Sequence, residues 1–263
     1  RASYGEIGNQ AVGSNMYIST VSKRTDGNTH WLNGSNKVVA YDLPSLVSPT
    51  LKWERIQTLD IGGDFGFFNN ELNISFDWYQ RTTKDMLAPG QTMPDVLGAG
   101  APKINAGTLR TRGWELSIDW RHHFNEVNVY ANASIGDFKT VITKWDNDSQ
   151  LLNENYSGKV YGDIWGFETD RYFTKDDFNA DGSYKEGIAS QKKLEQDGFV
   201  YGPGDIKFKD LNNDKEINGG EGTVKDHGDL KVIGNTTPRY QYGFRLGGEW
   251  KGIDIDMFFQ GVG

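Results

Sequence analysis

The chain has 263 residues, and its 28 Lys and Arg against 36 Asp and Glu give a formal net charge of −8. This acidic balance argues against a nucleic-acid partner, because nucleic-acid-binding domains usually carry basic patches. No segment approaches the roughly 18 consecutive apolar residues of a membrane helix, and the lack of cysteine excludes disulfides and thiolate metal sites. A membrane β-barrel stays open, because the lumen-facing residues of its strands are polar.

An alternating pattern begins in the segment after Thr58. Up to Phe67, the odd positions are apolar or glycine and the even positions are polar or glycine, and this period of two predicts a strand with one apolar face. After Asn69-Asn70 the alternation resumes from Glu71 to Tyr79, with the apolar residues at even positions. Two adjacent asparagines between such runs predict a tight hairpin.

Two more hairpins follow the same rule. The segments 114–121 and 127–135 alternate on either side of a predicted turn at His122–Asn125. Further along the chain, the segments 240–246 and 253–259 alternate on either side of a turn at Lys251-Gly252. The sequence therefore predicts three hairpins with short turns.

Long connections separate these hairpins, at about residues 6–52, 85–108 and 137–238. Short and long connections alternate, which is how an outer-membrane barrel distributes its periplasmic turns and extracellular loops. We therefore predict an all-β fold, a transmembrane antiparallel β-barrel with long extracellular loops and short periplasmic turns. A soluble β-sandwich that binds a glycan is the alternative, because its strands alternate just as strictly.

Aromatic residues mark both ends of the predicted strands, as they do where the strands of a membrane barrel cross the two interfaces. The two groups are about one strand length apart, so we expect them to form two aromatic belts. The candidates are Phe67, Trp120 and Trp250 beside the short turns, and Trp53, Trp114 and Tyr240 at the opposite strand ends, beside the long connections.

A series of longer motifs runs from the first residue to about residue 261. The motifs are Arg1-Ala2-Ser3-Tyr4-Gly5 with Gly8-Asn9, Leu51-Lys52-Trp53-Glu54, Asp64-Phe65-Gly66-Phe67-Phe68-Asn69-Asn70, Lys84-Asp85-Met86-Leu87, Asn105-Ala106-Gly107, Arg112-Gly113-Trp114-Glu115, the stretch from Gly204 to Asn212, and Phe258-Phe259-Gln260-Gly261. In residues and order they resemble the SusC/RagA family of TonB-dependent outer-membrane transporters.

This resemblance implies a barrel of about 22 strands closed by a plug, of which residues 1–263 supply part of the C-terminal half. The plug, the earlier strands and the closing strand are then expected to lie outside this sequence. The resemblance also implies the outer membrane of a Gram-negative bacterium of the Bacteroidetes, contact with outer-membrane lipid, a SusD-like surface lipoprotein as partner, and energy from the TonB complex acting through the plug. No cofactor is required.

One local motif predicts a metal site in the third long connection. Asp210, Asn212, Asp214, Glu216 and Glu221 follow the 1, 3, 5, 7, 12 spacing of a calcium loop, in which alternate oxygen ligands converge on a hard cation. The sixth position of such a loop favours glycine, and this chain has Lys215 there. Two interpretations stay open: a Ca²⁺ site, and a polar turn held by hydrogen bonds from backbone amides to side chains.

No pattern of catalytic residues is present in the sequence. It contains no GxSxG motif, and its four histidines lie in predicted loops or turns. Acidic residues two positions apart on a strand are better explained as the polar lining of a pore, so we predict that the protein is not an enzyme. The expected lumen-facing residues are Asp60, Asp64, Asp77, Tyr79, Glu115, Asp119, Arg121, Tyr130, Arg245, Glu249, Asp254 and Asp256.

Taken with the resemblance, the sequence predicts a SusC-like transporter subunit that imports a bulky nutrient, with TonB-derived energy and a SusD-like lipoprotein lid. A polar lumen with inward tyrosines suits a hydrated oligosaccharide or peptide, since such groups stack on and hydrogen-bond these solutes. The alternative function is that of a SusC-like barrel serving as a structural or docking subunit of a larger outer-membrane assembly or secretion complex.

Overall fold

A seven-stranded antiparallel sheet is the main element of the chain. The computed structural model describes residues 1–9, 16–24, 32–33, 36–37, 39–90 and 93–263. The strand order β1-β6-β7-β8-β9-β14-β15 follows the chain, so each strand lies beside the sheet strand that precedes it. The strands are β1 (Ala2–Asn9), β6 (Glu54–Phe67), β7 (Leu72–Pro89), β8 (Lys103–Phe124), β9 (Val127–Lys144), β14 (Tyr240–Trp250) and β15 (Ile253–Val262). The predicted all-β fold is confirmed.

Shorter elements lie in the connections between these strands. Four two-stranded sheets pair β10 with β13, β11 with β12, β2 with β5 and β3 with β4 within the described residues. No helix in the described part of the chain is long and apolar enough to span a membrane. The elements are β2 (Lys23–Arg24), β3 (Leu32–Asn33), β4 (Asn36–Lys37), β5 (Ala40–Tyr41), β10 (Asp163–Phe167), β11 (Thr169–Tyr172), β12 (Ile206–Phe208), β13 (Leu230–Asn235), and the 3₁₀ helices η1 (Asp95–Leu97), η2 (Lys175–Asp177) and η3 (Lys192–Leu194).

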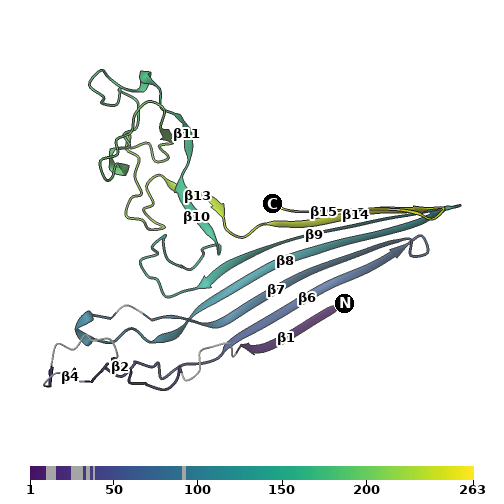
Figure 1. Cartoon of the computed structure of the whole chain (residues 1–263), viewed down its shortest axis with the longest axis horizontal. Coiled ribbons are helices and arrows are strands. Elements are labelled where there is room, and N and C mark those ends of the chain that lie inside the picture. Colours follow the sequence, from purple (N-terminus) through teal and green to yellow (C-terminus); the bar gives the residue numbers. More distant parts are fainter. Residues whose placement is uncertain (10–15, 25–31, 34–35, 38, 91–92) are drawn as a thin grey trace.

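The three short turns lie at one end of the sheet and the long connections leave from the other (Figure 1). At Lys251-Gly252 both turn residues have positive φ, 48° and 83°, which matches the right-handed twist of the flanking strands. The turn predicted at His122–Asn125 is wrong in its bounds. Strand β8 continues to Phe124, because His122 and His123 pair with residues of β9, and the turn is Asn125-Glu126.

The strands also extend further into the long connections than the sequence indicated. Strand β1 runs to Asn9, β7 to Pro89 and β9 to Lys144, while β8 begins at Lys103, so these stretches of the predicted loops 6–52, 85–108 and 137–238 are paired backbone. The strict alternation of apolar and polar residues is lost there, as in the apolar run Met86-Leu87-Ala88, although the strand pairing continues. Parts of the first two predicted loops, residues 10–15, 25–31, 34–35, 38 and 91–92, lie outside the described residues.

Most buried apolar residues lie in or against the connection between β9 and β14, which we call the loop unit (residues 145–239). The rings of Phe173, Phe178, Tyr184 and Tyr201 form a cluster with centroid distances from 5.1 to 6.4 Å. The sheet differs, because large apolar side chains on it, such as Ile255, which is 60% exposed, have no cover within the chain. A soluble sandwich would bury such a face against a second sheet.

Candidate functional site

The strand register places the predicted lumen-facing residues on one face of the sheet. Residues directly opposite in an antiparallel pair point to the same side, as do residues two apart along a strand. Tyr79 is opposite Asp60, Asp77 is opposite Glu115, and Tyr130 is opposite Arg121. Continued through β14 and β15, this register assigns all twelve predicted residues to one side of the sheet, which we call the polar face.

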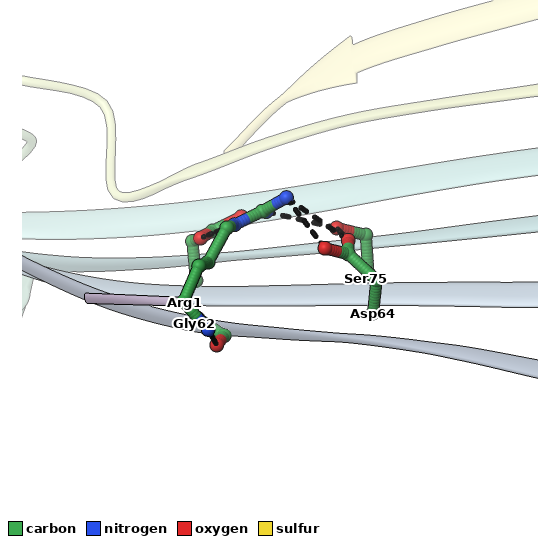
Figure 2. Close-up of polar contacts among 5 residues, drawn as sticks. Arg1, Gly62, Asp64 and Ser75 are labelled. Atoms are coloured by element: carbon green, nitrogen blue, oxygen red, sulfur yellow. Dashed lines mark hydrogen bonds and ion pairs between the residues drawn. The ribbon is translucent and has the colours of Figure 1, made fainter. Parts of the chain in front are cut away.

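One group of ionic contacts on the polar face joins three neighbouring strands (Figure 2). The Arg1 guanidinium lies next to β1 and donates from Nη1 to Asp64 Oδ2 on β6 at 2.7 Å. Its Nε and Nη2 both donate to the Asp77 carboxylate on β7, and Nη2 also donates to Ser75 Oγ at 3.1 Å. Both carboxylates and the guanidinium are partly exposed, so these contacts hold the side chains in position and contribute little stability.

A second group of contacts joins β9, β14 and β15. Arg245 Nε donates to Asp256 Oδ2 at 2.8 Å, and Tyr130 donates its hydroxyl proton to the same carboxylate. The Arg245 guanidinium also lies 5.8 Å from the centroid of the Tyr130 ring. An aromatic ring, a cation and a carboxylate are thus held side by side on this face, which is a combination suited to sugar hydroxyls or to peptide groups.

Two glycines make room for the two tyrosines of the polar face. A Cβ atom added at Gly113 would overlap the Tyr79 ring, and one added at Gly247 would overlap the Tyr130 ring. In each pair the tyrosine is directly opposite the glycine on the neighbouring strand. Each ring therefore extends across the neighbouring strand at a position where that strand has no side chain.

The polar face borders a hollow of about 750 Å³. Its lining includes Ser75, Asp77, Tyr79 and Glu115 from β7 and β8, together with Phe258 and Gln260 from β15. Phe258 is 62% exposed and shares the polar face with Arg245, its direct partner on β14. The lining thus mixes carboxylates, hydroxyls and aromatic rings.

The opposite side of the sheet, which we call the apolar face, carries aliphatic and aromatic rows. Ile118 is opposite Ile74 on β7 and Ala133 on β9, and Leu246 is opposite Met257 on β15. Of the predicted belt residues, Phe67 and Trp250 end β6 and β14, Tyr240 begins β14, and Trp53 directly precedes β6. Trp120 is opposite Leu72 near the turn end. The placement of Trp114 at a strand end is wrong, because β8 begins at Lys103 and Trp114 lies in its interior, opposite Trp78.

The structure places the predicted calcium residues in a loop closed by amide hydrogen bonds. Asp210 accepts from the backbone amides of Asn213 and Lys215 at 2.6 and 2.9 Å, and Asp214 accepts from that of Glu216 at 2.8 Å. The Glu216 carboxylate is 2.6 Å from Lys193 Nζ. Within the described ranges, no three His, Asp or Glu residues are grouped to hold a metal ion. These contacts are compatible with the polar turn, and Asn212 Oδ1 likewise accepts from the Asp214 amide, at 3.0 Å. The Ca²⁺ site stays a prediction, with Asp210, Asn212, Asp214, Glu216 and Glu221 as its expected ligands.

Two ion-pair clusters stabilise the loop unit. Asp177 is 3% exposed and accepts from both terminal nitrogens of Arg171, at 2.7 and 2.6 Å, and from the Thr174 amide at 2.7 Å. The Arg171 hydrogen bonds hold the Asp177 pKa well below its usual range. Hydrogen bonds from Lys209 and then from Lys231 lower the pKa of Glu168 to about 2. The connection is therefore a folded unit with its own ionic anchors.

Several residues of the polar face were not predicted from the sequence. Arg1 was missed because the pairing of β1 with β6 joins segments about fifty residues apart, and no local pattern indicates such a pairing. Phe258 was missed because it is an apolar residue on a polar face. Its position between Met257 and Phe259, on a strand of period two, is the signal that could have placed it.

Comparisons with known proteins agree with this geometry. Residues 1–250 match a family model described as TonB dependent receptor-like, beta-barrel. The chain is 28% identical over 277 residues to TonB-dependent receptor P3 of Formosa agariphila, and the alignment covers 99% of this chain and 25% of that protein. It is 27% identical over 217 residues to TonB-dependent receptor SusC of Bacteroides thetaiotaomicron, covering 76% of this chain and 19% of SusC.

A solved structure shares the fold. The RagAB peptide importer in its open-open state superposes with a TM-score of 0.68 at 21% identity, covering 99% of this chain and 25% of the matched chain. The chain spans about a quarter of the length of the curated relatives that it matches.

Proposed function

The chain belongs to the TonB-dependent receptor-like β-barrel family, and we propose that it forms part of the barrel wall of an outer-membrane importer of a bulky nutrient. Members of the family are SusC-like outer-membrane transporters and receptors, not enzymes. The predicted fold, location and lack of an enzymatic role are thereby confirmed, and the soluble sandwich is wrong. The relatives from Formosa and Bacteroides agree with the expected Bacteroidetes source.

The separation of the two faces is the observation that carries the proposal. Continuous apolar rows on one side suit lipid, and a polar side with acidic, hydroxyl and aromatic groups suits a hydrated passage. Both run across the same strands, with the long connections at one end and the tight turns at the other (Figure 1). In the proposed orientation the long connections face the cell surface.

The proposed cargo is an oligosaccharide or a peptide. Tyr79, Tyr130 and Phe258 offer ring surfaces beside carboxylates on the polar face, and both solute classes combine apolar surfaces with many hydrogen-bonding groups. The solved RagAB structure is named as a peptide importer, which adds support for a peptide. Import of this kind is expected to use energy from the TonB complex, acting through a plug.

The proposed partner is a SusD-like surface lipoprotein that covers the loop end. The loop unit has its own core and ion pairs, and rigidly held loops are where barrels place recognition. It also exposes large apolar side chains, with Tyr172 and Val200 both 67% exposed. The same exposed residues favour the second candidate function, in which the barrel docks other subunits of a larger outer-membrane assembly.

Affinity purification of the full-length protein from detergent-solubilised outer membranes tests both candidates. Recovery of a single surface lipoprotein together with bound glycans or peptides is the result expected of an importer. Recovery of a fixed set of further membrane or secretion subunits, with no bound solute, would contradict import and favour the docking function. A loop-unit variant, Tyr172→Ser with Val200→Ser, should lower the yield of the protein partner in either case.

A further inference from the structure

An unpaired group of cations lies on the apolar face, just beyond the aromatic residues at the loop end. Trp78 and Trp114 are directly opposite each other on β7 and β8. Two residues closer to the loops, Arg112 is opposite Gln80 on β7 and Lys139 on β9. Arg110 follows two residues further along β8 on the same side. We call Arg110, Arg112 and Lys139 the basic cluster.

The basic cluster lacks the partners that cations on a sheet normally have. Arg112 and Lys139 are exposed and directly opposite, and like charges in such a pair repel each other. No ion pair with a carboxylate is formed by the three side chains within the part of the chain that the structure describes. Arg112 Nε donates to Gln80 Oε1 at 2.7 Å, which orients the guanidinium and leaves its two terminal nitrogens for another acceptor.

Two other cations near the ends of the sheet have carboxylate partners. At the loop end, Arg239 makes two hydrogen bonds to Asp137, at 2.8 and 2.6 Å. At the turn end, Lys251 Nζ is 2.8 Å from Glu126 Oε2. The basic cluster differs from these two cations, because it lies next to the aromatic row without a carboxylate partner among the described residues. This arrangement can accept an anion supplied from outside the chain.

We propose that the basic cluster binds the phosphate groups of a lipid headgroup in the outer leaflet of the outer membrane. Tryptophan side chains mark the level at which the hydrocarbon core gives way to headgroups, and the row of Arg112 and Lys139 lies about 6 to 7 Å further along the strands. A phosphate there relieves the repulsion and accepts two parallel hydrogen bonds from the guanidinium. The inference rests on the outward orientation in the proposed function, but not on transport.

Binding of diphosphorylated lipid A to the full-length protein in neutral detergent tests the proposal. The double variant Arg112→Gln, Lys139→Gln should weaken binding tenfold or more, and the parent's affinity should fall as salt is raised. The matched control is Arg81→Gln, since Arg81 is an exposed cation at the same level of β7 but on the polar face, opposite Thr111. That control should bind the lipid as the parent does.

The proposal would be overturned if the double variant bound lipid A with the same affinity as the parent, or if the parent bound lipid A stripped of its phosphates with the same affinity. Displacement of lipid A by millimolar inorganic phosphate would also overturn it, because it would indicate a site for a free anion. The charge-retaining variant Arg112→Lys, Lys139→Arg should keep most of the binding, which separates loss of charge from misfolding. Failure of nutrient uptake with intact lipid binding would refute the proposed import while leaving this inference standing.

Discussion

Substitution of Ile118 by arginine is the perturbation for which the two faces give the clearest expectation. Ile118 lies on the apolar face of β8, between Ile74 and Ala133, and four residues from Trp114 toward the turn end. At about 3.3 Å per residue, and with the strand tilted, this places it about 10 Å inside the aromatic row and between Trp114 and Trp120, within the apolar band. An arginine at that depth destabilises a membrane barrel by about 2–4 kcal/mol.

The neighbouring residue supplies the matched control. Ser117 lies on the polar face, opposite Ser75 and Ser134, so Ser117→Arg places the same charge at the same depth but on the side proposed to face the hydrated passage. Its effect should stay within about 1 kcal/mol. The assay is guanidinium unfolding of the full-length protein in lipid vesicles, followed by tryptophan fluorescence. Equal losses for the two variants, or a larger loss for Ser117→Arg, would refute the assignment of the faces.

Three further predictions concern the loop unit and the lumen. Asp177→Ala removes the acceptor of Arg171 and of a backbone amide, so it should lower the loop unit's free energy of unfolding by about 1–3 kcal/mol and speed its proteolysis in intact outer membranes. Because the pKa of Glu168 is lowered, its two lysine contacts stabilise the loop unit fully above the ordinary pKa of 4.5 and progressively less as the pH falls toward about 2. Amide hydrogen exchange in the loop unit, measured between pH 5 and 2.5, should detect this loss of stability. Protection that does not change with pH, after correction for the intrinsic exchange rate, would contradict it. Gly247→Val should displace the Tyr130 ring and weaken solute binding while the barrel stays folded. The control Gly252→Ala, in the turn, should leave solute binding unchanged. Unaltered binding by Gly247→Val would show that the Tyr130 ring is not part of the passage.

Local alternation was sufficient to predict the hairpins and the two faces. In β6 to β9 the period of two depends only on neighbouring residues, so it indicated which side of each strand is polar before any pairing was known. The paired ends of β7 and β8 beyond the aromatic row gave no such signal. Consecutive residues there, such as Arg110 and Thr111, are both polar and point to opposite faces of the sheet, so neither face is marked as apolar. Strand length was underestimated there for that reason.

Contacts between distant segments could not be predicted from the sequence. The contact of Arg1 with Asp64 and Asp77 depends on the pairing of β1 with β6, and the fold of the loop unit depends on pairings such as β10 with β13. The spacing from Asp210 to Glu221 did identify a structured loop, but spacing alone does not separate ligands from amide acceptors. The lysine at the sixth position, with φ of 67°, was the residue that departed from the calcium pattern.

Uptake by cells that lack the gene of the full-length protein is the measurement that tests the proposed import most directly. The deletion strain should lose energy-dependent uptake of one bulky solute, an oligosaccharide or a peptide, and regain it with the wild-type gene. The polar-face variant Tyr79→Ala with Tyr130→Ala should restore it only in part, and Ile61→Leu on the apolar face fully. Unchanged uptake of both solute classes in the deletion strain, together with loss of an outer-membrane assembly, would contradict the importer and favour the docking subunit.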